Sequence, residues 1–134
     1  MNVVLDTNVL VSGLMSSGGT CSHILRLAGY EAFEPCLDSA ILREYDEVLR
    51  RPELDIPSED AEGILDLMRE HCEEWSRTPL PTVLPDPKDE MFLEVAAASR
   101  AVLVTGNLKH FPPKSRSGVT VVTPAEFLDS LRRA

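Results

Sequence analysis

Short apolar runs alternate along this chain with longer segments in which apolar residues recur every three or four positions. The short runs are rich in β-branched residues and predict buried strands at residues 2–5, 32–37, 101–105 and 119–123. The helical spacing predicts helices at residues 20–29, 40–51, 58–75, 87–100 and 124–133. Because strands and helices alternate, the pattern favours βαβ units with right-handed crossovers, and therefore an α/β domain with a parallel sheet.

Polar residues that commonly cap helices stand at several predicted boundaries. The candidate capping residues are Thr7 or Asn8, Thr20, Ser39, Asp86 and Thr123. Between the predicted helices at 58–75 and 87–100, residues 78–87 read TPLPTVLPDP, with four prolines in ten positions. Proline fixes its own φ and restricts the residue before it, so this stretch is predicted to be extended.

Composition is typical of one globular domain spanning residues 1–134. Charged residues make up 26% of the chain and apolar residues 43%. No apolar run approaches the roughly 18 residues of a membrane span, and the N-terminus does not resemble a signal peptide, so no membrane association is predicted. Three cysteines without CxxC spacing favour reduced thiols over a disulfide framework or zinc knuckle, as expected of a cytoplasmic protein.

The formal net charge of −9 is unevenly distributed. Residues 31–90 contain eighteen acidic and six basic residues, whereas residues 91–134 contain three acidic and six basic ones. The chain therefore lacks the overall basic balance of most nucleic-acid binders. The acidic middle is either a solvated helix face or a docking surface for a basic partner.

Three carboxylates interrupt apolar patterns, although they are far apart in sequence. Asp6 follows the first predicted strand directly, at the strand end where parallel α/β sheets bind ligands. Asp89 shares a helix face with Phe92 and with other apolar residues, and Glu44 borders an apolar helix stripe. Each has an ordinary alternative: Asp6 could form a turn or cap, Asp89 could complement the helix dipole, and Glu44 could lie exposed at the rim.

Taken together, the three carboxylates indicate a metal site. Three negative charges brought close together repel one another and raise one another's pKa, and a hard divalent cation removes that conflict. Mg²⁺ prefers oxygen ligands and retains several waters, a combination suited to phosphodiester hydrolysis. Such a cation would also reconcile an acidic chain with a polyanionic substrate. Lys109 lies beyond a predicted strand end, where it either contacts a nucleic-acid backbone or is simply solvated.

Four segments, in order, resemble the motifs of the PIN domain family, specifically its toxin-like (VapC-type) ribonucleases. They are VVLDTNVLVSGL, SAILREYDEVLRRP, DPKDEMFLEVAAAS and VLVTGNLKHF. The resemblance implies a three-layer α/β/α sandwich with a central parallel sheet, PIN-like and thus Rossmann-like. It also implies a Mg²⁺- or Mn²⁺-dependent endoribonuclease that leaves 5′-phosphate and 3′-hydroxyl ends. The implied partners are RNA as substrate, a cognate antitoxin that covers the active site, and often a second copy of the chain in a homodimer.

The resemblance also assigns metal-site roles to individual residues of this chain. It implies that Asp6, Glu44 and Asp89 are the acidic residues of the catalytic metal site. Asn107 matches a further metal-site position that is Asp in many members. An amide still offers its carbonyl oxygen but adds no negative charge, so this departure puts a second metal ion in doubt.

For the substrate, the resemblance implies that Thr7 and Asn8 shape the site beside Asp6. Thr105 would position water or phosphate. His110 matches a position that is an acid or His in several relatives, and it either touches substrate or is a surface loop residue.

Two other functions fit parts of the pattern. A PIN-like module with weakened catalysis, which binds RNA or a protein partner, would explain Asn107. A phosphoacceptor signalling domain of similar size fits less well, because that chemistry needs an acidic pair after the first strand and the DTN motif supplies one acid.

Overall fold

A computed structural model, which describes residues 1–81 and 83–133, confirms the parallel α/β architecture. Its sheet has four parallel strands in the order β2-β1-β3-β4. Their bounds are β1 Asn2–Leu5, β2 Glu34–Pro35, β3 Val102–Val104 and β4 Val121–Val122. Central strands β1 and β3 pair in the register Val3 to Val102 and Leu5 to Val104, so their carboxyl ends lie side by side.

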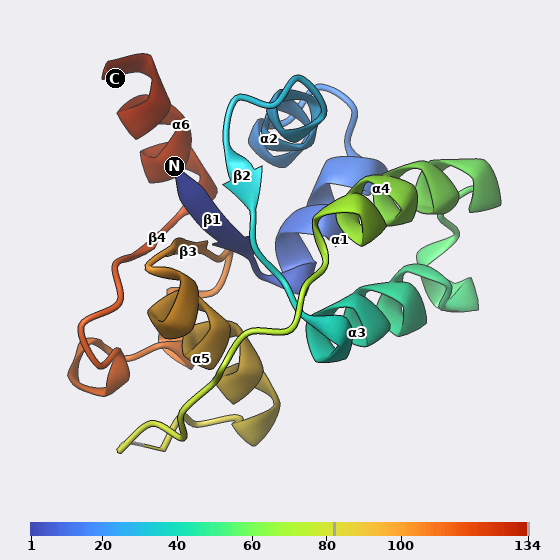
Figure 1. The fold of residues 1–134 in the computed structure, drawn as a ribbon. Coiled ribbons are helices and arrows are strands. Elements are labelled where there is room, and N and C mark those ends of the chain that lie inside the picture. The colour runs from blue at the N-terminus through green and yellow to red at the C-terminus, as the bar shows by residue number, and fades with distance from the viewer. Residues whose placement is uncertain (82, 134) are drawn as a thin grey trace.

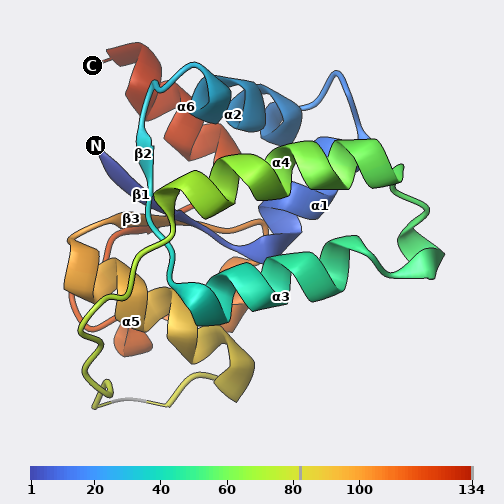
Figure 2. The same ribbon diagram turned by 45° about the vertical axis from the view of Figure 1, so that its right-hand side comes forward.

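Helices cover both faces of this sheet, as the predicted sandwich requires (Figures 1 and 2). In the described part of the chain they are α1 Thr7–Met15, α2 Thr20–Gly29, α3 Ser39–Leu49, α4 Ser58–His71, α5 Glu90–Ser99 and α6 Pro124–Arg133. The α2 and α6 helices pack together on one side, and α5 packs against β1 and β3 on the other. Helices α1, α3 and α4 form a group beside the carboxyl end of β1 (Figure 1).

The core lies between the central strands and the apolar faces of these helices. Val3, Val4 and Leu103 are completely buried, as expected for parallel strands covered on both faces. Aromatic rings close the side that carries α6, where Phe33 and Phe127 meet edge to face with their centroids 5.2 Å apart. No helix among residues 1–81 and 83–133 combines the length and apolar character that crossing a membrane would demand.

The helix predicted at 58–75 is shorter in the structure and ends at His71. Cys72 instead pairs with Leu37 as a parallel bridge, and the Glu73 amide donates a hydrogen bond to the Leu37 carbonyl. Pairing with a distant segment therefore overrides the helical spacing in the last four residues. The strand predicted at 32–37 is also shortened, because the Ala32 amide still bonds to the end of α2.

Capping differs from the prediction at three helices. At α1 the N-cap is Asp6, without a side-chain hydrogen bond, whereas Thr7 and Asn8 are already helical. The side chain of Asp38, rather than Ser39, accepts a hydrogen bond from the Ile41 amide at the start of α3. Thr20 is already the first helical residue of α2, because Gly19 occupies the N-cap position without a side-chain bond.

The other two caps behave as predicted. Asp86 accepts a bond from the Lys88 amide, where a short 3₁₀ turn at Pro87–Asp89 precedes α5. Thr123 and Glu126 form a reciprocal capping box at α6. The proline-rich stretch has no helix or strand before Pro87, with Thr82 lying outside the described residues.

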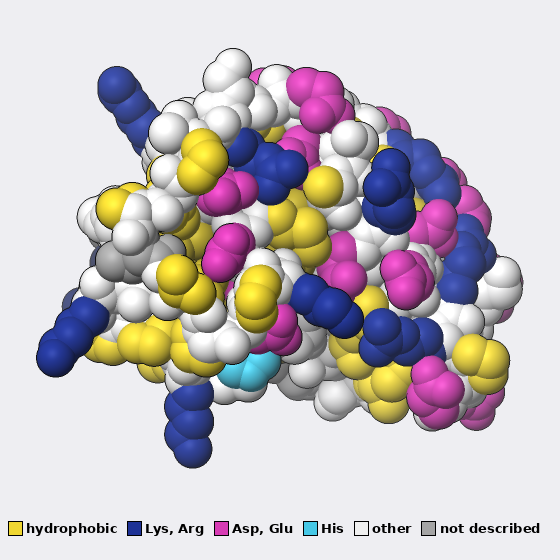
Figure 3. Space-filling model, turned by 90° about the horizontal axis from the view of Figure 1, so that it is seen from below, with side chains coloured by type: hydrophobic (Ala, Val, Ile, Leu, Met, Phe, Trp, Pro, Cys, Tyr) yellow, Lys and Arg dark blue, Asp and Glu magenta, His cyan; other side chains and the backbone are white. Residues whose placement is uncertain are grey.

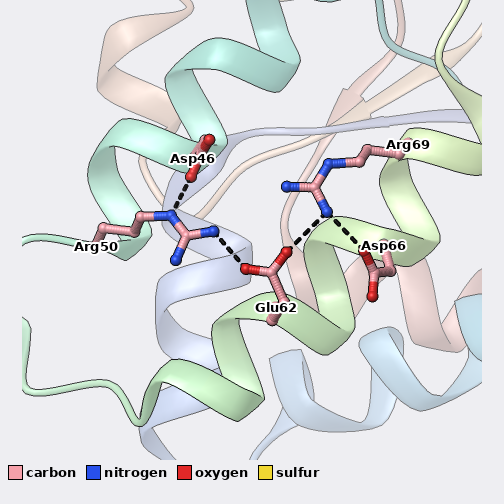
Figure 4. A network of polar contacts seen from close by, with 5 residues as sticks. All are labelled: Asp46, Arg50, Glu62, Asp66 and Arg69. Atoms are coloured by element: carbon pink, nitrogen blue, oxygen red, sulfur yellow. Dashed lines mark hydrogen bonds and ion pairs between the residues drawn. The ribbon is translucent and has the colours of Figure 1, made fainter.

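A charged network joins the surfaces of α3 and α4 (Figure 4). Arg50 pairs with Asp46 on its own helix and with Glu62 on α4. Glu62 also pairs with Arg69, which pairs in turn with Asp66. Because these side chains are substantially exposed, the network contributes little to stability, although its Arg50–Glu62 pair links the end of α3 to α4.

Candidate active site

A pocket of about 330 Å³ opens at the carboxyl ends of the strands, between α3 and the turn that precedes α5. Six residues singled out from the sequence line it: Asp6, Thr7, Asn8, Glu44, Asp89 and His110. They come from four separate parts of the chain, which only the fold brings together. Figure 3 views the molecule from this side, where acidic side chains lie near a histidine and basic side chains project around them.

Asp6 is held by the strand that lies next to its own. Its amide donates to the Val104 carbonyl at 2.9 Å, which extends the β1–β3 ladder by one residue. The Thr105 hydroxyl donates to Asp6 Oδ2 at 2.9 Å, and the Asp6 side chain is almost completely buried. Burial raises the pKa of Asp6 above its ordinary value, although the hydrogen bond from Thr105 opposes that shift.

Asn8 ties the two strand ends together. Its Nδ2 lies 3.4 Å from Asp6 Oδ2, and its Oδ1 accepts a hydrogen bond from the Gly106 amide at 3.0 Å. Thr105 continues this arrangement, because its hydroxyl accepts a hydrogen bond from the backbone N–H of Asn107 while it donates one to Asp6. The DTN and TGN segments therefore form one hydrogen-bonded unit whose function is to orient the Asp6 carboxylate.

Glu44 reaches the pocket from α3 and is half-buried. Within residues 1–81 and 83–133, its carboxylate has no hydrogen bond or ion pair. The adjacent residue, Tyr45, is fully buried and donates its hydroxyl to the Leu5 carbonyl. That bond fastens α3 to the end of β1 and thereby sets the position of Glu44 relative to Asp6.

Asp89 is buried to 8% exposure at the start of α5. Burial, followed by the negative charge of Asp6, raises the pKa of Asp89 to about 6, and His110 opposes this rise. His110 Nδ1 lies 2.8 Å from Asp89 Oδ2, yet that oxygen has no hydrogen bond of acceptable geometry within the described residues. A buried carboxylate oxygen without a directed donor is energetically unfavourable unless a positive charge lies beside it, and here either a protonated His110 or a bound metal ion could supply that charge.

The donor set fits a hard divalent cation. Three carboxylates line one pocket. Burial raises the pKa of two of them, Asp6 and Asp89, because it disfavours their negative charge, and a bound cation would offset that penalty. The Thr7 hydroxyl is also buried, and it has no hydrogen-bond partner among the residues that the structure describes. Among the described residues, no three His, Cys, Asp or Glu side chains already stand within reach of one ion. Binding therefore requires side-chain adjustment, which the unpaired Glu44 can make.

Three of the predicted site residues, Thr105, Asn107 and Lys109, lie outside the pocket lining. Asn107 is half-buried and Lys109 is exposed on the 3₁₀ turn Leu108–His110. Thr105 lies behind Asp6 and acts through it. Sequence analysis did not single out Arg51, which follows α3. Among the described residues, Arg51 and His110 are the only basic side chains that line the pocket. Local periodicity could not have placed Arg51, because α3 ends at Leu49 and the backbone of Arg51 is extended.

Comparison with known proteins agrees with the fold and the motif order. The profile of the PIN domain family matches residues 2–109, which include all the candidate metal-site residues. No curated protein sequence matches the chain significantly. Among solved structures, this protein is similar in fold to one chain in the crystal structure of VapBC2 from Rickettsia felis, which is bound to a DNA fragment from the VapBC2 promoter. The TM-score is 0.58 at 18% identity, over 92% of this chain and 98% of that one. The match over most of its length shows that this chain belongs to the PIN domain family.

Proposed function

We propose that this protein is a metal-dependent endoribonuclease that hydrolyses RNA phosphodiester bonds, and that it is the toxin of a toxin–antitoxin pair. The observation that carries the proposal is the convergence of Asp6, Glu44 and Asp89 on one pocket at the carboxyl edge of the sheet. PIN domains are generally nucleases, and family membership adds support to this reaction class.

In this proposal the three carboxylates hold Mg²⁺ or Mn²⁺. The bound cation supplies positive charge for the scissile phosphate and lowers the pKa of water. Thr105 and Asn8 keep the Asp6 carboxylate in one orientation through the hydrogen bonds between the strand ends. Arg51 lies on the same pocket wall and offers a positive charge to a phosphate of the RNA backbone.

The proposed partners follow from the same assignment. We infer that a cognate antitoxin binds this chain, which is supported by its similarity in fold to a chain of VapBC2. A homodimer is the assembly proposed from the family resemblance, and the cytoplasm is where an RNA-cleaving toxin would meet its substrate. Lys109, exposed on the turn that carries His110, is proposed as a contact to RNA outside the pocket.

The test is cleavage of a mixed RNA pool by the purified protein with Mg²⁺, with Mn²⁺ and with EDTA. The expected result is metal-dependent cleavage that leaves 5′-phosphate ends and disappears in Asp6→Asn and Asp6→Ala. Glu90→Gln is the matched control, because Glu90 neighbours Asp89 but does not line the pocket. RNA binding without cleavage in any metal would instead support the weakened binding module, which the amide at Asn107 favours.

A further inference from the structure

We propose that His110 is a ligand of the metal centre, that it takes the place of the carboxylate missing at Asn107, and that it favours Mn²⁺ over Mg²⁺. This inference rests on the proposed function, because it concerns the same centre. It differs from the expectation that Asn107 completes the ligand set and that His110 touches substrate.

The first argument is the geometry of His110 and Asp89. Their Nδ1 and Oδ2 atoms are 2.8 Å apart, so the two side chains form an ion pair when the imidazole is protonated, although an N–H on Nδ1 falls outside good hydrogen-bond geometry toward that oxygen. Two ligands of one ion have this relation, because each directs its lone pair at the ion rather than at the other. In an octahedral site with bonds of 2.0–2.1 Å, neighbouring ligand atoms are about 2.9 Å apart.

The second argument is how firmly the turn holds His110 at the pocket. Its amide bonds to the Asn107 carbonyl, and the next residue, Phe111, is completely buried. The Phe111 carbonyl accepts a further hydrogen bond from Arg116 at 2.8 Å. The backbone on both sides of His110 is therefore anchored, whereas its imidazole remains partly exposed and lines the pocket.

The third argument is that Asn107 does not face the pocket in this way. Asn107 is absent from the pocket lining that contains His110, and its hydrogen bond to the Thr105 hydroxyl is made by the backbone N–H and does not involve the side chain. Of the two candidates for the additional ligand, the structure places only His110 beside a metal-site carboxylate.

The choice of ion follows from ligand chemistry. Mg²⁺ binds oxygen ligands and waters almost exclusively, whereas imidazole nitrogen is a good ligand for first-row transition ions. Replacing a carboxylate with an imidazole lowers the negative charge of the site and removes a hard oxygen donor. Affinity for Mg²⁺ should fall more than affinity for Mn²⁺, so the site discriminates in favour of Mn²⁺.

Metal binding by the full, metal-free chain tests this inference without any catalytic readout. We expect His110→Ala and His110→Gln to weaken Mn²⁺ binding by about tenfold or more in calorimetry, and to change Mg²⁺ binding by less than about threefold. Pulsed electron paramagnetic resonance of the Mn²⁺-loaded wild type should show coupling to a ¹⁴N nucleus. That coupling should vanish in both variants and persist in His23→Ala, which removes a histidine on α2 that does not line the pocket.

Several results would overturn the inference. Unchanged Mn²⁺ affinity, or no ¹⁴N coupling in the wild type, would show that His110 is not a ligand. Tighter Mn²⁺ binding in His110→Ala would show that the imidazole merely competes with the ion for Asp89. If Asp89→Asn loses Mn²⁺ binding and the His110 variants do not, His110 is not a ligand but the proposed function stands. If the wild type does not bind Mn²⁺ at all, both proposals are contradicted. Asn107→Ala should leave Mn²⁺ affinity unchanged, and a tenfold loss there would assign the ligand to Asn107 instead.

Discussion

Replacing Asp89 with asparagine should stabilise the metal-free protein at neutral pH, although it removes a candidate catalytic carboxylate. The raised pKa of about 6, against an ordinary 3.8, means that ionised Asp89 opposes folding. At about 1.4 kcal/mol per pKa unit, the full penalty is about 3 kcal/mol. Because the pocket opens to solvent, screening reduces it, and we expect a gain of about 1–2 kcal/mol from Asp89→Asn.

The sign of the pH dependence follows from the direction of the shift. A group whose pKa is raised on folding stabilises the protein while it is protonated, and this contribution disappears as pH rises through about 6. At pH 7.5 the wild type therefore bears the whole penalty and the variant bears none. The two proteins should have similar stability only below pH 3.8, where the wild-type carboxyl is largely protonated in the folded and the unfolded chain alike, and at pH 5 roughly half of the penalty should remain.

Thermal unfolding in EDTA at pH 7.5 and at pH 5 provides the assay. We expect Asp89→Asn to melt about 3–6 °C higher at pH 7.5, and by roughly half that difference at pH 5. The control Glu90→Gln should melt with the wild type at both pH values. A variant that is less stable at pH 7.5, or that gains equally at both pH values, would refute the reasoning.

Adding metal should reverse the order of stability. An ion at one hundred times its dissociation constant stabilises the native state by about 2.7 kcal/mol. The wild type should gain that stabilisation from Mn²⁺ at pH 7.5, and Asp89→Asn should gain much less because it lacks a charged ligand. Equal Mn²⁺-induced shifts in the two proteins would remove Asp89 from the metal site.

Three further predictions concern groups that position the site or the helices around it. Thr105→Val should weaken Mn²⁺ binding about tenfold, because Asp6 loses the hydrogen bond that orients it, and calorimetry measures this directly. Tyr45→Phe should lower the free energy of unfolding by about 1–3 kcal/mol in urea, because the Leu5 carbonyl loses its buried partner; no change would remove the anchoring role of that bond. Glu62→Gln should lower the melting temperature slightly. Because Arg50 lowers the pKa of Glu62, the difference should shrink in high salt and as the pH falls below the ordinary pKa of 4.5, and salt and pH series of melting temperatures measure this.

Local patterns were enough to predict the fold class. Parallel strands covered on both faces must be continuously apolar, and the helices around them show a helical repeat, so residues 2–5 and 124–133 were recognisable at once. The carboxylates Asp6 and Asp89 stood out for the same reason, because each interrupts an apolar pattern where a charge needs compensation. The capping residues at 86 and 123 follow from backbone chemistry confined to a few neighbouring positions.

Distant contacts settled the remaining features. Helix α4 ends at His71 because Cys72 pairs with Leu37, a partner that local periodicity cannot reveal. His110 and Asn107 both follow β3. His110 lies against Asp89 and lines the pocket, whereas Asn107 does not line it. Hydrophobic periodicity reports which face of a segment is buried. The direction and partners of a polar side chain depend on how separate segments pack, and in this protein that packing determines which residues share the pocket.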